Sequence, residues 1–553
     1  MKMLKPLLAS LALSVAACSS DLPSEKETGF NASGYASPLS DSEYSSLSPE
    51  QQYQITNNLL GTLYKGIAAD EFFDLSNGMN TQSLKEGKNF LAKARQAVAT
   101  PLSAQERSEH DLIIDGCEDE LECAQVVEPR FTFRTRPKEL PLARIFQYPL
   151  SKDMFDHWIA YVLANSILFS PAEENDSADI TDVQNVYRRL VLALADNQDI
   201  RQIVLRHQMS VENWRRFRSP EDNTREMIEI FLGLVDRDDD VPRASTACQD
   251  WYLTDESEGY KLARTDFPNN TPQLVLDSYV TTCEDFYQLI ASHPLLVPRV
   301  TGVLVNYFFA QRSTEDKKKM VDSIVQSNPT TFQEIFTAIV FSKQYLMHTE
   351  RPKSFEESFF NLAHRMKWDP SSEDNRRRRD LFQGLISNRG GAARAYLSEM
   401  NWAPMVLKLG RTSDVPLDSL SFANYHKGLR EVLLLDNTLW QKGLGLYNPG
   451  ELPQDATAEE AARYQRDLAL YNPVITALPV EDYLDYLFVT VAGRKANDTE
   501  KTDLITILDG ANQLITEDDG RKTVRTNRHD DSARIVFDYL SRLPEIYYIN
   551  KFN

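Results

Sequence analysis

Apolar residues recur at helical spacing along most of this chain. Met154, Trp158, Tyr161 and Val162 fall on one face of a predicted helix, and the segment 181–194 continues the pattern after a capping Thr181. Few segments alternate between apolar and polar residues, and the sequence has no internal repeat. The pattern predicts a mainly α protein, a multi-helix globular bundle or array with few or no β-strands, preceded by a disordered tether.

Breaks in the helical pattern divide the chain into regions. A segment rich in Ser, Gly, Pro and Glu precedes residue 48, prolines follow residue 128, and a Pro- and acid-rich break begins near residue 449. The predicted regions are a signal peptide over 1–17, a flexible linker over 18–47, an N-terminal helical region over 48–128, a central helical domain over 129–370, and helical regions over 371–448 and 449–553.

The first residues resemble a bacterial lipoprotein signal. Lys2 and Lys5 precede an apolar stretch of roughly a dozen residues, which is too short to span a bilayer. Small residues then lead to Cys18, which we expect to be lipidated, although an ordinary cleavage site with an accidental cysteine is the alternative. Two or more acyl chains give stable anchoring. Ser19 and Ser20 favour the outer membrane over inner-membrane retention, and the choice between its periplasmic and surface faces stays open.

Charge and cysteine content narrow the possible partners and the compartment. The formal net charge of −21 at pH 7 repels nucleic acid phosphates, so no nucleic acid partner is expected. Four further cysteines in an exported chain suggest two disulfides. Proximity favours Cys117–Cys123 and Cys248–Cys283, although four cysteines allow three pairings.

Two groups of acidic residues are candidates for chemistry. Arg225, Glu226 and Glu229 share an otherwise apolar predicted helix, where carboxylates one turn apart suit acid/base work or cation binding. The structural alternative is an Arg225–Glu229 ion pair. With Trp251 nearby, an aromatic ring beside carboxylates suits a sugar.

The second acidic group is the run 236–241, which begins like a calcium loop through Asp236, Asp238 and Asp240. It lacks the glycine and the glutamate of an EF-hand, since Val241 and Ala247 occupy those positions. A helix-terminating acidic loop is the alternative to weak Ca²⁺ binding. No other cofactor is expected.

One basic cluster stands out in this acidic sequence, formed by Arg376, Arg377, Arg378 and Arg379. Four arginines suit phosphates of lipopolysaccharide or an acidic partner surface. A solvated face opposite neighbouring acids is the alternative. The sequence contains no G-x-S-x-G, P-loop or H-E-x-x-H motif, so no catalytic class is indicated.

A set of residues between 150 and 365 resembles a family signature. The matching positions are Leu150, Met154, Trp158, Glu221, Arg225, Glu226, Glu229, Phe231, Asp240, Val241, Trp251, His293, Pro294, Ser342, Tyr345, Lys353, Glu356 and Arg365. The set is similar to the uncharacterised secreted bacterial family called domain of unknown function eighteen hundred. The chain departs from that pattern at Asp250, where the family has glycine.

The resemblance implies a secreted helical protein, with a second secreted protein encoded nearby as a partner, and it implies no mechanism. Together with the predicted anchor, it leads us to expect a lipid-anchored outer-membrane lipoprotein that acts as a non-enzymatic scaffold or assembly factor of the cell envelope. Its partners would be the membrane and envelope proteins. The alternative is an envelope hydrolase or cation-dependent enzyme acting on polysaccharide or peptidoglycan.

Overall fold

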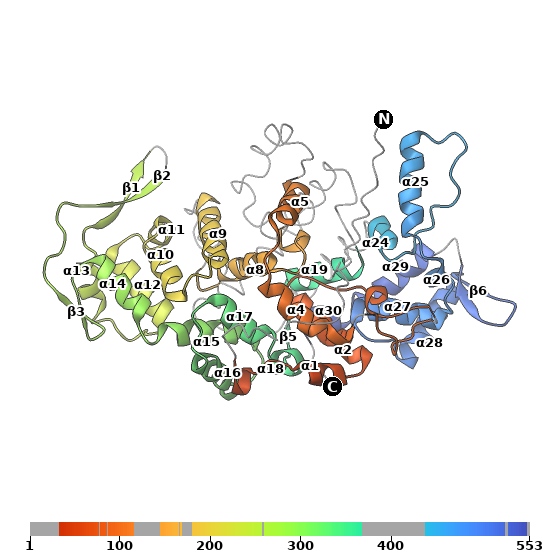
Figure 1. The fold of residues 1–553 in the computed structure, drawn as a ribbon, viewed down its shortest axis with the longest axis horizontal. Coiled ribbons are helices and arrows are strands. Elements are labelled where there is room, and N and C mark those ends of the chain that lie inside the picture. The colour runs from red at the N-terminus through yellow and green to blue at the C-terminus, as the bar shows by residue number, and fades with distance from the viewer. Residues whose placement is uncertain are drawn as a thin grey trace.

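Helices dominate the computed structural model of the chain. It describes residues 32–76, 78–85, 87–115, 144–164, 166–168, 180–256, 259–367, 437–525 and 529–549. Of these residues 61% are helical and 8% are in strands, and the strands form only two-stranded sheets. This confirms the predicted mainly α class. Figure 1 shows an elongated body with the hairpins β1–β2 and β3–β4 at one end and the hairpin β6–β7 at the other.

The N-terminal part begins with short, well-capped helices. Its elements are η1 (Gly34–Ala36), α1 (Asp41–Ser46), α2 (Pro49–Thr62), α3 (Ala69–Phe72), η2 (Gly87–Asn89), α4 (Phe90–Ala99) and α5 (Ala104–Asp115). Ser40 and Ser48 each accept a hydrogen bond from the backbone N–H three residues later, and Glu43 and Gln51 bond back to complete two capping boxes.

The predicted flexible linker over 18–47 is wrong for its last part. Ala36, Leu39 and Tyr44 are buried in the main core, and the backbone N–H of Leu39 donates to the carbonyl of Phe341. Ser40 and Ser48, which suggested a linker, are helix N-caps. The prediction failed because serine is common both in loops and at helix starts, where its hydroxyl accepts from the first backbone N–H groups. Residues 18–31 lie outside the described residues.

The central part is a series of helices interrupted by two hairpins. Its helices are α8 (Lys152–Ala164), α9 (Ile180–Ala195), α10 (Ile200–Gln208), α11 (Val211–Arg216), α12 (Pro220–Leu232), α13 (Val241–Ala247), α14 (Cys283–Ser292), α15 (Leu296–Phe308), α16 (Thr314–Gln326), α17 (Phe332–Val340), α18 (Lys343–His348) and α19 (Phe355–Arg365). Its strands are β1 (Trp251–Glu256), β2 (Gly259–Arg264), β3 (Gln273–Val275), β4 (Ser278–Val280) and β5 (Arg351–Pro352).

The two hairpins lie between α13 and α14. Strand β1 pairs antiparallel with β2, and β3 pairs antiparallel with β4. The turn of the second hairpin consists of Leu276 and Asp277, both with positive φ, which is the backbone of a tight two-residue hairpin turn. Outward-facing Leu274 and Tyr279 are cross-strand partners, while Val275 and Val280 turn toward the core.

The C-terminal part returns to the middle of the molecule. Its elements are α24 (Asn437–Gly443), α25 (Ala458–Leu470), α26 (Pro473–Thr476), α27 (Val480–Ala492), α28 (Asp498–Gly510), β6 (Leu514–Thr516), β7 (Lys522–Val524), α29 (His529–Leu540), α30 (Pro544–Tyr547) and β8 (Tyr548–Ile549). Strand β8 pairs antiparallel with β5, so the end of this part lies against the start of α19.

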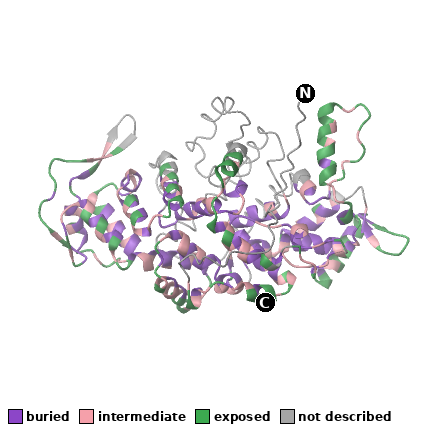
Figure 2. Ribbon diagram, in the orientation of Figure 1, coloured by how far each residue is buried: buried purple, intermediate pink, exposed green. Residues whose placement is uncertain are grey.

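A single hydrophobic core runs through the described residues. Helix α19 of the central part packs against α2 of the N-terminal part and against α27 of the C-terminal part. Figure 2 shows buried residues continuing through the body, whereas α25 and the tip of the β6–β7 hairpin are exposed. The described portions of the N-terminal, central and C-terminal regions predicted from the sequence therefore share one core.

Within the described part of the chain, no single helix is long and apolar enough to cross a membrane. Helices α14 and α15, bent by 63° at their junction, have the length and composition for it only as a pair. Their apolar faces, including Phe286, Ile290, Val300 and Leu304, are buried in the protein core.

Candidate functional site

Several residues singled out in the sequence lie outside the described residues. These are Cys18, Cys117, Cys123, Arg376, Arg377, Arg378 and Arg379. The second predicted disulfide, Cys248–Cys283, is confirmed, with an S–S distance of 2.01 Å. It joins the C-cap of α13 to the first residue of α14 and closes the segment that carries both hairpins.

Arg225 forms ion pairs with residues other than Glu229. Its guanidinium lies 2.5 Å from Asp238 and 3.6 Å from Glu221, and hydrogen bonding to Asp238 raises the pKa of the arginine. The pair with Asp238 ties α12 to the loop that follows it, and it is largely exposed. Arg225 therefore pairs with Asp238 and Glu221, and not with Glu229 as predicted. Glu226 and Glu229 are half-buried on the same helix.

Trp251 is part of an aromatic stack and does not line an open cleft. Only 4% of its surface is exposed. Its ring stacks on Trp214 with centroids 5.7 Å apart, meets Tyr287 edge to face, and lies under the guanidinium of Arg264. Such a stack stabilises the junction of α11, β1 and α14. The ring has no free face for a sugar.

Two aspartates of the 236–241 run bind arginine side chains, and one of them also accepts a backbone hydrogen bond. Asp238 pairs with Arg225, and Asp240 lies 2.6 Å from Arg237 and accepts a hydrogen bond from the backbone N–H of Leu276. Asp236 is exposed. Across the residues that the structure describes, no group of three or more His, Cys, Asp or Glu side chains is arranged to hold a metal ion.

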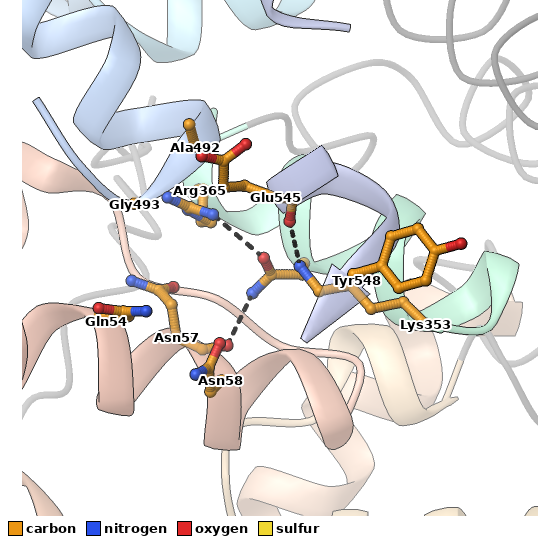
Figure 3. A pocket seen from close by; sticks show the side chains of 10 residues that line it. Gln54, Asn57, Asn58, Lys353, Arg365, Ala492, Gly493, Glu545 and Tyr548 are labelled. Carbon is orange, nitrogen blue, oxygen red and sulfur yellow. Dashed lines mark hydrogen bonds between the residues drawn. The ribbon is translucent and has the colours of Figure 1, made fainter. Parts of the chain in front are cut away.

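The structure assembles a polar recess that the sequence did not indicate (Figure 3). It lies where α2, α19, the end of α27 and the segment α30–β8 meet, and its volume is about 30 Å³, which suits a few water molecules. The lining residues are Gln54, Asn57, Asn58, Lys353, Asn361, Arg365, Ala492, Gly493, Glu545 and Tyr548.

Arg365 forms one wall of the polar recess and closes the C-terminus of α27. Its two terminal nitrogens donate to the carbonyls of Val491 at 3.0 Å and Val489 at 2.6 Å. These carbonyls belong to the last turn of α27, where a positive charge interacts favourably with the helix dipole. Burial lowers the pKa of Arg365. The arginine therefore joins α19 to α27.

Lys353 forms the opposite wall, immediately after β5. Its ammonium donates to the carbonyl of Glu545 at 2.7 Å, and its backbone N–H donates to the carbonyl of Tyr547. Burial, followed by the charge of Arg365, lowers the pKa of Lys353 to about 7. Lys353 and Arg365 were both noted in the family resemblance, but nothing in the sequence indicated that Gln54 and Glu545 would join them.

A buried ion pair joins β5 to the first turn of α19. Arg351 and Glu357 are almost fully buried and form a bidentate pair, and Arg351 also donates to the hydroxyl of Tyr345 at 2.8 Å. The guanidinium lies over the rings of Tyr307 and Phe308. Because every one of these contacts is internal, the pair orders the start of α19 and does not face a ligand.

The segment between the disulfide cysteines carries exposed apolar side chains. We call residues 249–282 the arm. Phe267 and Tyr279 are 81% and 75% exposed, and Tyr252 and Leu274 are also exposed. Isolated exposed apolar residues are ordinary, but aromatic residues gathered on one projecting segment are typical of protein interfaces.

Comparisons with protein families, curated proteins and solved structures found no match to this chain.

Proposed function

We propose that this protein is a lipid-anchored scaffold or assembly factor of the bacterial outer membrane, which acts through protein contacts made by the arm. Cys18 is the proposed attachment point, and the resemblance to domain of unknown function eighteen hundred is part of the same proposal. The partner is an envelope protein, for which a secreted protein encoded nearby is the first candidate.

The exposure of Phe267 and Tyr279 on a disulfide-closed segment is the observation that carries the proposal. Aromatic side chains bury a large area at low entropic cost, and they are enriched among residues that dominate binding energy. The disulfide fixes both ends of the arm, so less chain entropy is lost when a partner binds. Figure 1 shows the arm at the end of the body.

The contacts made by Trp251 and Arg225 favour the scaffold hypothesis over a polysaccharide hydrolase. An acid/base pair on α12 would need an open cleft with an aromatic platform. Trp251 instead stacks on Trp214, and Arg225 is occupied by Asp238 and Glu221. These contacts bury the Trp251 ring, so it does not serve as an aromatic platform beside Glu226 and Glu229.

Crosslinking in the native cells, followed by detergent extraction and mass spectrometry, tests the proposal. The tagged protein should capture a reproducible envelope partner, and the double variant Phe267→Ser/Tyr279→Ser should lose it. Ile507→Ser is the matched control, because Ile507 is exposed on α28, away from the arm. Capture of the same partner by the arm variant would refute the role of the arm. Retention of Cys18→Ala in the membrane fraction would refute the anchor.

A further inference from the structure

The segment 144–148 lies among basic side chains from other parts of the chain. Its residues Ile145, Phe146 and Tyr148 are buried. Lys65, which follows α2 and is 5% exposed, donates from its ammonium to the carbonyls of Phe146 at 2.5 Å and Tyr148 at 2.7 Å. The same ammonium lies 5.9 Å from the centroid of the Phe146 ring. A buried cation therefore fixes the end of this segment.

Two histidines pack against the same segment. His364, on α19, contacts Phe146 with ring centroids 4.3 Å apart, and His110, on α5, meets Tyr148 edge to face at 5.9 Å. Nε2 of His364 and Nδ1 of His110 are buried and have no hydrogen-bond partner within the described part of the chain. We call Lys65, His110 and His364 the basic junction, since it joins α2, α5 and α19 around one segment.

No carboxylate neutralises the basic junction. Among the residues that the structure describes, none of its three members forms an ion pair or a hydrogen bond with Asp or Glu. Burial, followed by the charge of Lys65, lowers the pKa of both His110 and His364. Glu109 and Glu106, on the same helix as His110, offset the shift of its pKa only in part. Both imidazoles are therefore neutral at pH 7.5.

The far side of Tyr148 is basic as well. His157, on α8, meets the Tyr148 ring at 5.5 Å, and Arg144 donates to the Tyr148 hydroxyl at 2.9 Å. Burial, followed by the charges of Arg144 and Arg107, lowers the pKa of His157 to about 3. A proton taken up by His110 therefore gains no compensating partner from this side.

Helix α5 depends on His110 for its attachment. Residues 104–109 are exposed, and His110 is the half-buried member of the side chains described on this helix (Figure 2). Arg107 adds an ion pair with Asp153 at 2.5 Å, in which the arginine side chain is 50% exposed. An exposed ion pair contributes little to stability. The contact of His110 with Tyr148 is therefore a point at which α5 can separate from the body.

We propose that the basic junction is an acid-operated switch that releases α5 and the segment 144–148 from α19. Protonation of His110 and His364 places positive charges near the ammonium of Lys65, where burial strengthens the repulsion between them. Separation of these elements returns the imidazoles to water and ends the repulsion. The switch involves neither the arm nor Cys18, so it can fail independently of the scaffold proposal.

The direction of the pH dependence follows from the lowered pKa of each imidazole. Below a pH of about 6.5 the opened form takes up protons that the closed form does not, so opening increases as the pH falls. Between pH 7.5 and pH 5 each histidine contributes up to roughly 30-fold to the opening equilibrium. We expect an increase of at least roughly tenfold for the pair.

Hydrogen–deuterium exchange of the full chain at pH 7.5, 6 and 5 tests the switch, with labelling times corrected for the intrinsic pH dependence of exchange. Peptides from 104–115 and 144–150 should exchange at least roughly tenfold faster at pH 5 than at pH 7.5. Peptides from α27 should keep their protection, which distinguishes local opening from unfolding of the whole protein. Unchanged protection of 104–115 and 144–150 at all three pH values would overturn the proposal.

Variants assign the response to the two histidines. His110→Gln and His364→Gln should each remove part of the acid response, and the double variant should remove most of it. His293→Gln should keep the response, because His293 lies after α14 and accepts hydrogen bonds from Arg201 and Leu295. Near-ultraviolet circular dichroism at pH 7.5 checks that each variant is folded. A full acid response in both single variants would show that other groups cause the opening.

Discussion

Asp240 accepts a hydrogen bond from the backbone N–H of Leu276 at 3.2 Å. Leu276 is buried and has a φ of 48°, a conformation that a leucine rarely adopts. The contact links the start of α13 to the turn of the β3–β4 hairpin, 36 residues later. A carboxylate that looked like part of a calcium loop thus holds the base of the arm.

Asp240→Ala should destabilise the arm. The substitution removes a charge-assisted hydrogen bond to Leu276 and an ion pair with Arg237, so we expect a loss of about 2–3 kcal/mol in the free energy of unfolding. Urea unfolding measures it. The control is Asp239→Ala, an exposed neighbour that should change stability by less than about 0.5 kcal/mol. Equal stability of the two variants would show that the turn does not depend on Asp240.

The buried pair of Arg351 and Glu357 should respond asymmetrically to substitution. Removing either partner leaves a buried charge without its counter-ion, so Arg351→Met and Glu357→Leu should each cost about 3–5 kcal/mol. The double variant removes both charges and should recover much of that loss. Chemical unfolding of all four proteins gives the coupling energy. Additive losses in the double variant would contradict the arrangement.

His207 should make the protein sensitive to mild acid. Burial, followed by the charges of Arg189 and Arg216, lowers the pKa of His207 to about 3, against about 6.5 in the unfolded chain. As the pH falls below 6.5, the unfolded chain takes up a proton that the folded chain does not, so stability decreases until the pH reaches about 3. Between pH 7 and pH 5 this loss is about 2 kcal/mol from His207 alone.

His207→Gln tests this directly, since glutamine is polar and does not titrate. Urea unfolding at pH 7 and pH 5 should show a smaller pH-dependent loss in the variant than in the parent. His157, whose pKa burial also lowers to about 3, keeps its own contribution in both proteins. An unchanged loss in His207→Gln would mean that this imidazole is charged in the folded protein.

The disulfide should contribute to the stability of the arm. Cys248 and Cys283 are 35 residues apart, and closing a loop of that length stabilises the folded state by about 3–4 kcal/mol in the chain-entropy description. Cys248→Ser/Cys283→Ser should therefore lower the melting temperature. Adding a reductant should lower the melting temperature of the parent by more than that of the variant, which keeps only the predicted Cys117–Cys123 bond. Identical melting of parent and variant would show that the bond adds nothing.

Local features of this fold could be predicted from the sequence, and contacts between distant segments could not. The helix at α12 was predicted from its apolar face, and the Cys248–Cys283 disulfide from the proximity of its cysteines. Both predictions are confirmed. The serine caps at 40 and 48 were misinterpreted, because serine is common both in linkers and at helix starts. The hairpin β1–β2 was missed because its short strands carry mixed polar residues.

The polar recess could not be predicted from the sequence for the same reason, because distant segments form it. Gln54, Lys353 and Glu545 come from three parts of the chain, and each is an ordinary polar residue in its own sequence context. Only the packing of α19 between α2 and α27 gathers them. For Arg225 the sequence offered several acidic neighbours within reach, and the choice of Asp238 depends on how the loop after α12 turns back.

The pairing of β8 with β5 determines when, during synthesis of the chain, the central core can finish folding. Lys353 and Ser358 hydrogen-bond to carbonyls of Glu545 and Ile546, more than 180 residues later in the chain. Contacts so far apart are slow to form, because the loop between them must first be closed. A growing chain therefore cannot finish its central core before residue 549 has been made. Until then the amino acids around Lys353 stay open to water, and a chain cut short before α30 would present that opening to proteases.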